Sequence, residues 1–301
     1  MARVRLNWTV DSLPQGSIPL EGVRSLGDAE IGVVFQPIVD VRTGLLFAHE
    51  VLVRCTRAEY ASPTILFEHA VKEGACGRLG RKIREAAFAT SGDCALFVNL
   101  HPEELTARWL VRPDDPIGFH KRDVYLEITE SATMTHFEVC MSVLKELRGR
   151  TNARLVVDDF GAGYSNIERL IQLEPAVVKL DLAIIRDIHR ERRKQVVTRH
   201  LVRLCKDLGA TVVAEGVETQ EELQCIIDLG VDFAQGYLLA RPANPPPAHV
   251  WPFRRSGAPK PPKGPPPLPR GRPSLPVTTP PRRPPSLRVG PKSKPPFGKS
   301  R

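Results

Sequence analysis

The chain has 301 residues, of which 42% are hydrophobic and 26% charged, and this composition indicates a globular protein with a large buried core. The formal net charge is +9, but residues 245–301 hold 13 Lys and Arg and no acidic residue, so the rest of the chain carries 34 acidic against 30 basic residues. The overall basicity therefore does not indicate that the folded part binds nucleic acid.

Residues 1–28 form a short lead-in that cannot be a domain of its own. From Ile31 onward, short apolar runs rich in β-branched residues alternate with longer stretches of helical periodicity. The runs predict eight strands, at 31–39, 45–53, 94–100, 123–128, 154–159, 176–181, 211–216 and 231–237. The helical patterns lie at 62–90 (two helices), 136–150, 191–209 and 219–230, and the last two end in Gly, a helix stop signal.

Strands that alternate with helices predict an α/β fold with a mostly parallel sheet, and eight of them predict a closed (β/α)8 TIM-like barrel over residues 29–244. The linker DVRTG (40–44) between the first two strands is too short for a crossover helix, so this first strand pair should be antiparallel. From Pro245 the chain contains 20 of its 29 prolines. Residues 245–301 are therefore expected to be a disordered, polyproline-II-rich basic tail.

Acidic and amide side chains follow the predicted strands. A single acidic residue at a strand end is usually only solvated, so the argument depends on the whole set: Glu50, Asn99, Glu127, Asp158, Asp159 and Glu215. Barrel active sites are assembled from several strands at their C-terminal ends, where these residues would meet.

Carboxylates gathered in this way repel one another and resist ionisation unless a cation neutralises them. Oxygen ligands without His or Cys favour Mg²⁺ or Mn²⁺ over Zn²⁺. Two such ions about 3.5–4 Å apart are a common arrangement for in-line attack of water on a phosphodiester. The strand ends thus predict a site for Mg²⁺ or Mn²⁺, and a pair of such ions would suit attack on a phosphodiester.

At these positions the chain resembles the EAL-domain family of cyclic-di-GMP phosphodiesterases, over about residues 32–242. Eight family motifs occur in order. They are QPI at 36–38, EVLVR at 50–54, NLH at 99–101, EITE at 127–130, DDFGAGYS at 158–165, KLD at 179–181, EGVE at 215–218 and QGY at 235–237.

The resemblance implies a role for each matching residue. Two ions, Mg²⁺ or Mn²⁺, would be held by metal ligands from five positions: Glu50, Asn99, Glu127, Asp158 and Asp159. The catalytic group would comprise Lys179 near the attacking water or phosphate, Glu215 as candidate general base, Gln235 to position the metal–water cluster, and Glu130 to hold the 158–167 loop. Substrate contacts would come from Gln36, Leu52, Arg54 and Asp181. The implied reaction converts cyclic di-GMP into linear pGpG.

Three features depart from the family pattern. Val51 stands where the motif has Ala, and His101 stands where it has Ser. The family's last helix has no room here, and Trp251 and Phe253 are expected to cover the bottom of the barrel instead. His101 is either an exposed loop residue or a residue that tunes substrate or metal binding.

Two alternatives remain at this point. A catalytically impaired EAL domain would act as a cyclic-di-GMP receptor or a protein-interaction module. The basic proline-rich tail could bind nucleic acid, an anionic membrane or a protein partner, or only aid solubility.

The six cysteines are scattered, without CxxC pairs, as in a reducing compartment. No apolar run reaches the length of a membrane span, and the N-terminus lacks the apolar core of a signal peptide. We therefore expect a cytoplasmic protein, which by resemblance would form a homodimer.

Overall fold

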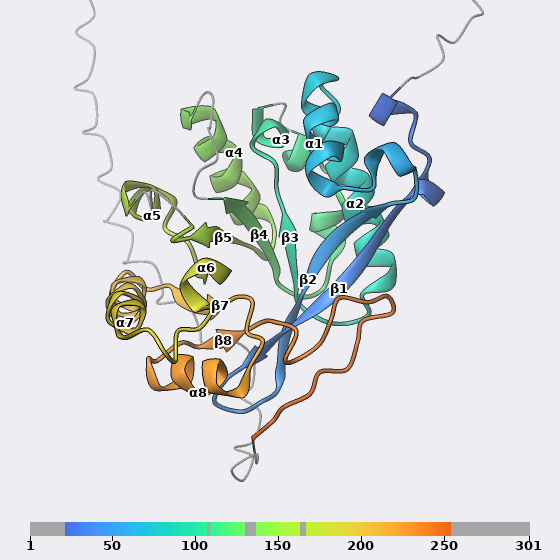
Figure 1. Cartoon of the computed structure of the whole chain (residues 1–301). Helices are drawn as coiled ribbons and strands as arrows, with labels where there is room; N and C mark the ends of the chain where they lie inside the picture. The colour runs from blue at the N-terminus through green and yellow to red at the C-terminus, as the bar shows by residue number, and fades with distance from the viewer. Residues whose placement is uncertain (1–21, 107–108, 130–136, 163–166, 254–301) are drawn as a thin grey trace, which may run out of the picture. The chain divides into compact units, whose positions relative to one another are not determined.

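The computed structural model of the chain describes residues 22–106, 109–129, 137–162 and 167–253. Its strands close into one barrel in sequence order (Figure 1). They are β1 (Ile31–Asp40), β2 (Leu46–Cys55), β3 (Leu96–Asn99), β4 (Val124–Thr129), β5 (Ala153–Phe160), β6 (Val177–Leu180), β7 (Thr211–Ala214) and β8 (Phe233–Ala234). The prediction of eight strands in a TIM-like barrel is confirmed.

The direction of the strands also agrees with the prediction. β1 pairs with β2 and with β8 in antiparallel fashion, whereas each successive pair from β2 to β8 is parallel. The short turn after Asp40 accounts for the antiparallel hairpin, because it leaves no chain for a crossover.

Helices follow the strands and cover the barrel from outside. They are α1 (Pro63–Lys72), α2 (Cys76–Thr90), α3 (Pro102–Thr106), α4 (Phe137–Arg150), α5 (Ile167–Leu173), α6 (Leu182–Ile185), α7 (Arg192–Asp207) and α8 (Gln220–Asp228). The short helices α3, α5 and α6 were not predicted, because four to seven residues are too few to show a helical period. Within the described ranges, none of the helices has the length and apolarity to span a membrane.

The lower interior of the barrel is filled by apolar side chains. Its members are Ile38, Ala48, Phe97, Tyr125, Val156, Val177, Val213 and Phe233. A register shift in the β1–β2 ladder leaves Phe47 without an opposite residue, and its ring stacks on Phe233 with centroids 4.0 Å apart. The barrel is thus a packed core at this end, and any site must lie above this layer.

The chain beyond β8 runs back along the β1–β2 hairpin (Figure 1), where Ala243 forms an antiparallel bridge with Phe35. Ala243 exchanges two backbone hydrogen bonds with Phe35 (2.8 and 3.0 Å), and His249 Nε2 lies 2.9 Å from the carbonyl oxygen of Gly44. Trp251 and Phe253 pack against the core between barrel and helices. The packed chain therefore continues past the expected boundary at residue 244, while residues 254–301, and with them most of the predicted tail, lie outside the described residues.

Candidate active site

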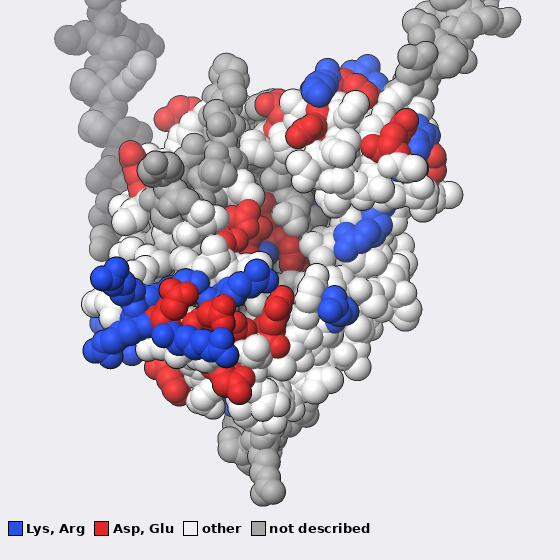
Figure 2. Space-filling model, in the orientation of Figure 1, with Lys and Arg blue, Asp and Glu red and all other residues white. Residues whose placement is uncertain are grey.

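Eight polar residues form the interior layer directly above the apolar one. Each lies two positions from a member of the apolar layer, and since side chains alternate along a strand, both point inward. They are Gln36, Glu50, Asn99, Glu127, Asp158, Lys179, Glu215 and Gln235. β1 to β6 contribute one residue each, and Glu215 and Gln235 come directly after β7 and β8, so the layer lies at the edge where the parallel strands have their C-terminal ends. Figure 2 shows a hollow on this face, with acidic surface at its floor.

Lys179 lies at the centre of this layer. Its Nζ is 2.6 Å from Glu127 Oε1 and 2.6 Å from Glu215 Oε1, with Asp158 Oδ1 at 3.0 Å and Glu50 Oε1 at 3.5 Å. Burial alone would lower the pKa of Lys179, but the surrounding carboxylates raise it well above its ordinary value. One ammonium therefore faces four acids, and the layer keeps an excess of negative charge if all of them ionise.

Burial and the excess of negative charge raise the pKa values of Glu127 and Glu215. Burial, and then the charges of Glu50 and Asp158, raise the pKa of Glu127 well above its usual range, despite Lys179. Burial and the same two neighbours raise the pKa of Glu215 to about 8. A divalent cation would reverse both shifts by neutralising the charge, so the donor set suits such an ion.

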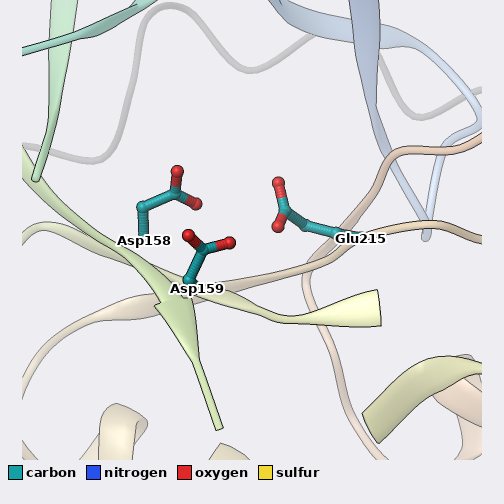
Figure 3. A group of neighbouring side chains, drawn as sticks. All are labelled: Asp158, Asp159 and Glu215. Carbon is teal, nitrogen blue, oxygen red and sulfur yellow. The ribbon is translucent and has the colours of Figure 1, made fainter. Parts of the chain in front are cut away.

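Asp158 and Asp159 are consecutive, yet both carboxylates face the site (Figure 3). In a regular strand one of them would point outward. The β5–β6 ladder has a bulge here: Val157 pairs with Val178 and Phe160 with Leu180, so the two aspartates stand opposite Lys179 alone. Asp159 adopts a left-handed backbone conformation (φ 55°), which turns its side chain inward.

One carboxylate oxygen from each of Asp158, Asp159 and Glu215 lies within 4.8 Å of the others. Burial and the neighbouring Asp158 raise the pKa of Asp159 to about 6. This second group of oxygens lies beside the Lys179 cluster and shares two members with it. The strained conformation of Asp159 is the local feature that brings the group together.

Amide side chains hold Glu50 in place. Gln235 Nε2 donates to Glu50 Oε2 (2.5 Å) and to Gln36 Oε1 (3.1 Å), and Gln36 Nε2 donates to the carbonyl of Ala240 (3.2 Å). Asn99 Nδ2 lies 3.1 Å from Glu127 Oε2. Gln235 Oε1 is buried without a hydrogen-bond partner among the described residues, so the layer still has an acceptor to offer a ligand.

The other residues predicted for the site lie around its edge. Leu52 and Arg54 line a pocket of about 880 Å³ that opens beside Glu50 and Asn99. The guanidinium of Arg54 donates through Nη1 to the carbonyl of Val53 (2.8 Å). Asp181 accepts the backbone N–H of Ala183 (2.7 Å) as the N-cap of α6. Glu130 lies outside the described residues.

The comparison with protein-family models matches residues 23–242 to the EAL domain. The chain belongs to the EAL domain family. Among curated EAL relatives, the cyclic di-GMP phosphodiesterase RocR of Pseudomonas aeruginosa is 31% identical over 239 residues, which cover 73% of this chain and 59% of RocR. An uncharacterised protein of Azorhizobium caulinodans is 34% identical over 230 residues, covering 69% of this chain and 30% of that protein.

Solved structures agree with this assignment. Klebsiella pneumoniae BlrP1, in complex with manganese and cyclic di-GMP, is 32% identical with a TM-score of 0.64, and the match covers 73% of this chain and 58% of the BlrP1 chain. A calcium and cyclic di-GMP complex of BlrP1 is 33% identical with a TM-score of 0.60, covering 71% and 56%. The chain thus spans less than two thirds of these relatives' length.

Two departures from the EAL motifs can now be located. Val51 is 2% exposed and packs in the core between barrel and helices, on the side of β2 away from the carboxylates. His101 lines the pocket, and its ring lies parallel to that of Phe67, at a centroid distance of 5.7 Å and an angle of 10°. The methyl groups of Val51 therefore do not enter the polar layer inside the barrel.

Sequence reasoning missed a buried ion-pair cluster behind the pocket. Arg84 donates to Glu104 Oε2 (2.7 Å) and to Asp115 Oδ2 (2.9 Å), and all three side chains are at most 3% exposed. Glu104 also accepts the backbone N–H of His101 (3.2 Å). The available signal was an Arg on the apolar face of a predicted helix, one residue after Ile83.

Proposed function

We propose that the protein is a metal-dependent phosphodiesterase that hydrolyses cyclic di-GMP to linear pGpG. The observation that carries the proposal is the gathering of five carboxylates, an asparagine and a lysine at the C-terminal edge of the barrel, beside a pocket of about 880 Å³. A pocket of this size suits a ligand as large as a dinucleotide. RocR is named as a phosphodiesterase of this substrate, and BlrP1 binds it together with manganese.

The oxygen-rich donor set supports a site for divalent cations, and we propose that it holds two. In this proposal Glu50, Asn99, Glu127 and Asp158 hold one ion, and Asp158 and Asp159 hold the other, with Glu215 nearby. Oxygen ligands alone favour Mg²⁺ or Mn²⁺. When bound, the ions would make water a stronger nucleophile at neutral pH and offset the charge that develops on the phosphate.

The chain's own residues have separate tasks. In the metal-free site burial raises the pKa of Glu215 to about 8, although Lys179 opposes the shift. With a cation bound that pKa would be lower, and an ionised Glu215 would accept the proton of the attacking water. Lys179 and Arg54 supply positive charge toward the phosphates. Leu52 and Asp181 contact the substrate.

The amide pair supports this arrangement from behind. Gln235 and Gln36 form a chain of hydrogen bonds from Ala240 to Glu50. They fix the orientation of a metal ligand, a form of support on which such sites depend. Water adds to one phosphorus and one P–O ester bond breaks, which leaves a terminal phosphate and a free hydroxyl on the linear product.

A homodimer is proposed through the face near the 158–167 loop. Ile167 and Ile171 of α5 are 49% and 58% exposed there. Light scattering of the protein and of an Ile171→Glu variant tests this contact, and a monomer at every concentration would contradict it. The cytoplasmic location and the binding roles of the tail stay predictions.

The test of activity is conversion of cyclic di-GMP to pGpG with Mg²⁺, Mn²⁺ or EDTA. Glu50→Gln should lower kcat/KM at least about 100-fold, because it replaces a charged ligand with a neutral side chain of the same size. Glu138→Gln, on the exposed surface of α4, is the matched control and should retain activity. Binding of cyclic di-GMP without turnover by the unmodified protein would contradict the enzyme and favour a receptor.

A further inference from the structure

The pocket beside the carboxylates has one wall that the proposed chemistry does not use. This wall comes from α1 and from the loop after β3, and includes Phe67, Val71, Leu100 and His101. The loop leaves β3 directly after Asn99. A base joined through its ribose to a phosphate at the carboxylates would therefore lie against this wall.

His101 is held in place from several sides. Its ring lies parallel to Phe67, and its Nδ1 accepts the backbone N–H of Glu103 (3.2 Å). Its own backbone N–H donates to Glu104 (3.2 Å), which the fully buried Arg84 fixes in turn. The ring is therefore preorganised, so little conformational entropy would be lost when a ligand binds.

The hydrogen bond at Nδ1 decides which ring nitrogen carries the proton. Because Nδ1 is an acceptor, Nε2 is the protonated nitrogen in this tautomer. Among the described residues Nε2 has no hydrogen-bond partner, and the side chain is only partly buried. His101 thus brings to the pocket wall a donor that no described residue uses.

Purine bases differ in what they present to such a donor. Along the edge that carries N7, guanine has two acceptors, N7 and O6, whereas adenine has the N7 acceptor and an amino donor. An N–H donor opposite O6 therefore favours guanine over adenine, because adenine has an amino donor at that position.

We propose that His101 is a specificity-determining residue that donates a hydrogen bond from Nε2 to O6 of one guanine of cyclic di-GMP. The inference rests on the proposed function and assigns a role to the position where the EAL motif has Ser. Phe67 acts as a positioning residue, because it supports the ring from one face.

The test compares binding of three cyclic dinucleotides to the full chain in Ca²⁺, the ion in the second BlrP1 complex. His101→Phe keeps a flat ring beside Phe67 and removes the donor, and His101→Gln keeps a donor. The probes are cyclic di-GMP, cyclic di-IMP, which retains O6 and N7, and cyclic di-AMP, which lacks O6.

His101→Phe should weaken the binding of cyclic di-GMP and cyclic di-IMP by about 3- to 10-fold, which is the contribution of one neutral hydrogen bond. The binding of cyclic di-AMP should weaken by less than about twofold. His101→Gln should recover part of the loss. In turnover with Mn²⁺ the effect should fall mainly on KM. A purely structural role would instead lower affinity for all three ligands together with the thermal stability.

Equal losses for all three dinucleotides, or unchanged affinity for cyclic di-GMP, would overturn the inference while the proposed function stands. No binding of cyclic di-GMP by the unmodified protein would overturn the proposed function and this inference with it.

Discussion

Arg84→Met removes the only cation of the buried cluster behind the pocket and keeps most of the aliphatic stem. Glu104 is 0% exposed and Asp115 is 3% exposed, so neither carboxylate can regain solvent when the guanidinium is lost. Breaking a buried ion pair on one side costs about 3–5 kcal/mol of unfolding free energy. At about 2–4 °C per kcal/mol for a domain of this size, the melting temperature should fall by roughly 6–20 °C.

The loss of stability in Arg84→Met should also depend on pH. Burial already raises the pKa of Glu104, although Arg84 opposes the shift, and without the guanidinium the pKa rises further. A raised pKa in the folded state means that stability is lost as the pH rises through it. Urea unfolding should therefore show a larger penalty at pH 8 than at pH 5.

Arg81→Met is the matched control, three residues earlier on α2. Arg81 pairs with Glu85 (2.8 Å) and Asp114 (2.9 Å), but these partners are 48% and 64% exposed, so the change should cost at most about 1 kcal/mol. Neutralising the acids as well, with Glu104→Gln and Asp115→Asn, should restore much of the stability lost in Arg84→Met. If Arg84→Met costs no more than Arg81→Met at pH 8, the reasoning is refuted.

Two further predictions concern the site. The pKa values of Asp159 and Glu215, raised to about 6 and about 8, imply that the metal-free protein loses stability as the pH rises from about 4, near the ordinary pKa of these acids, to about 8. Thermal unfolding in EDTA should show this decline and Mn²⁺ should abolish it, whereas the same slope with Mn²⁺ would argue against a cation at these acids. Gly236→Ala should cost about 1–3 kcal/mol and lower turnover, because a Cβ there would overlap the backbone of Val217 beside the site. Gly149→Ala, with nothing near the added methyl group, should be neutral or stabilising in the same melts.

Much of the fold follows from local pattern. The runs of β-branched residues predict every strand, because strands in such a barrel are buried on both faces and read as short apolar segments. The helices α1, α2, α4, α7 and α8 follow from the helical period of their apolar residues, because each buries one face against the barrel. The strand ends predict the polar layer, since all parallel strands point their C-terminal ends to one edge.

Other features needed the folded chain. The predicted strand at 154–159 is correct, yet regular alternation would turn Asp159 away from Asp158, and only the bulge against β6 brings both carboxylates inward. Arg84 lies on a predicted helix, but its partners Glu104 and Asp115 come from segments with no helical pattern long enough to locate them.

Local sequence was therefore sufficient for the number, order and direction of the strands and for the chemical types at their ends, because alternation and turn length are properties of neighbouring residues. Barrel closure decided that Lys179 would lie among four carboxylates and that the chain around Ala243 would pair with the β1–β2 hairpin. These contacts join residues far apart in the chain, and they depend on the stagger and bulges of the closed sheet, which no local pattern encodes.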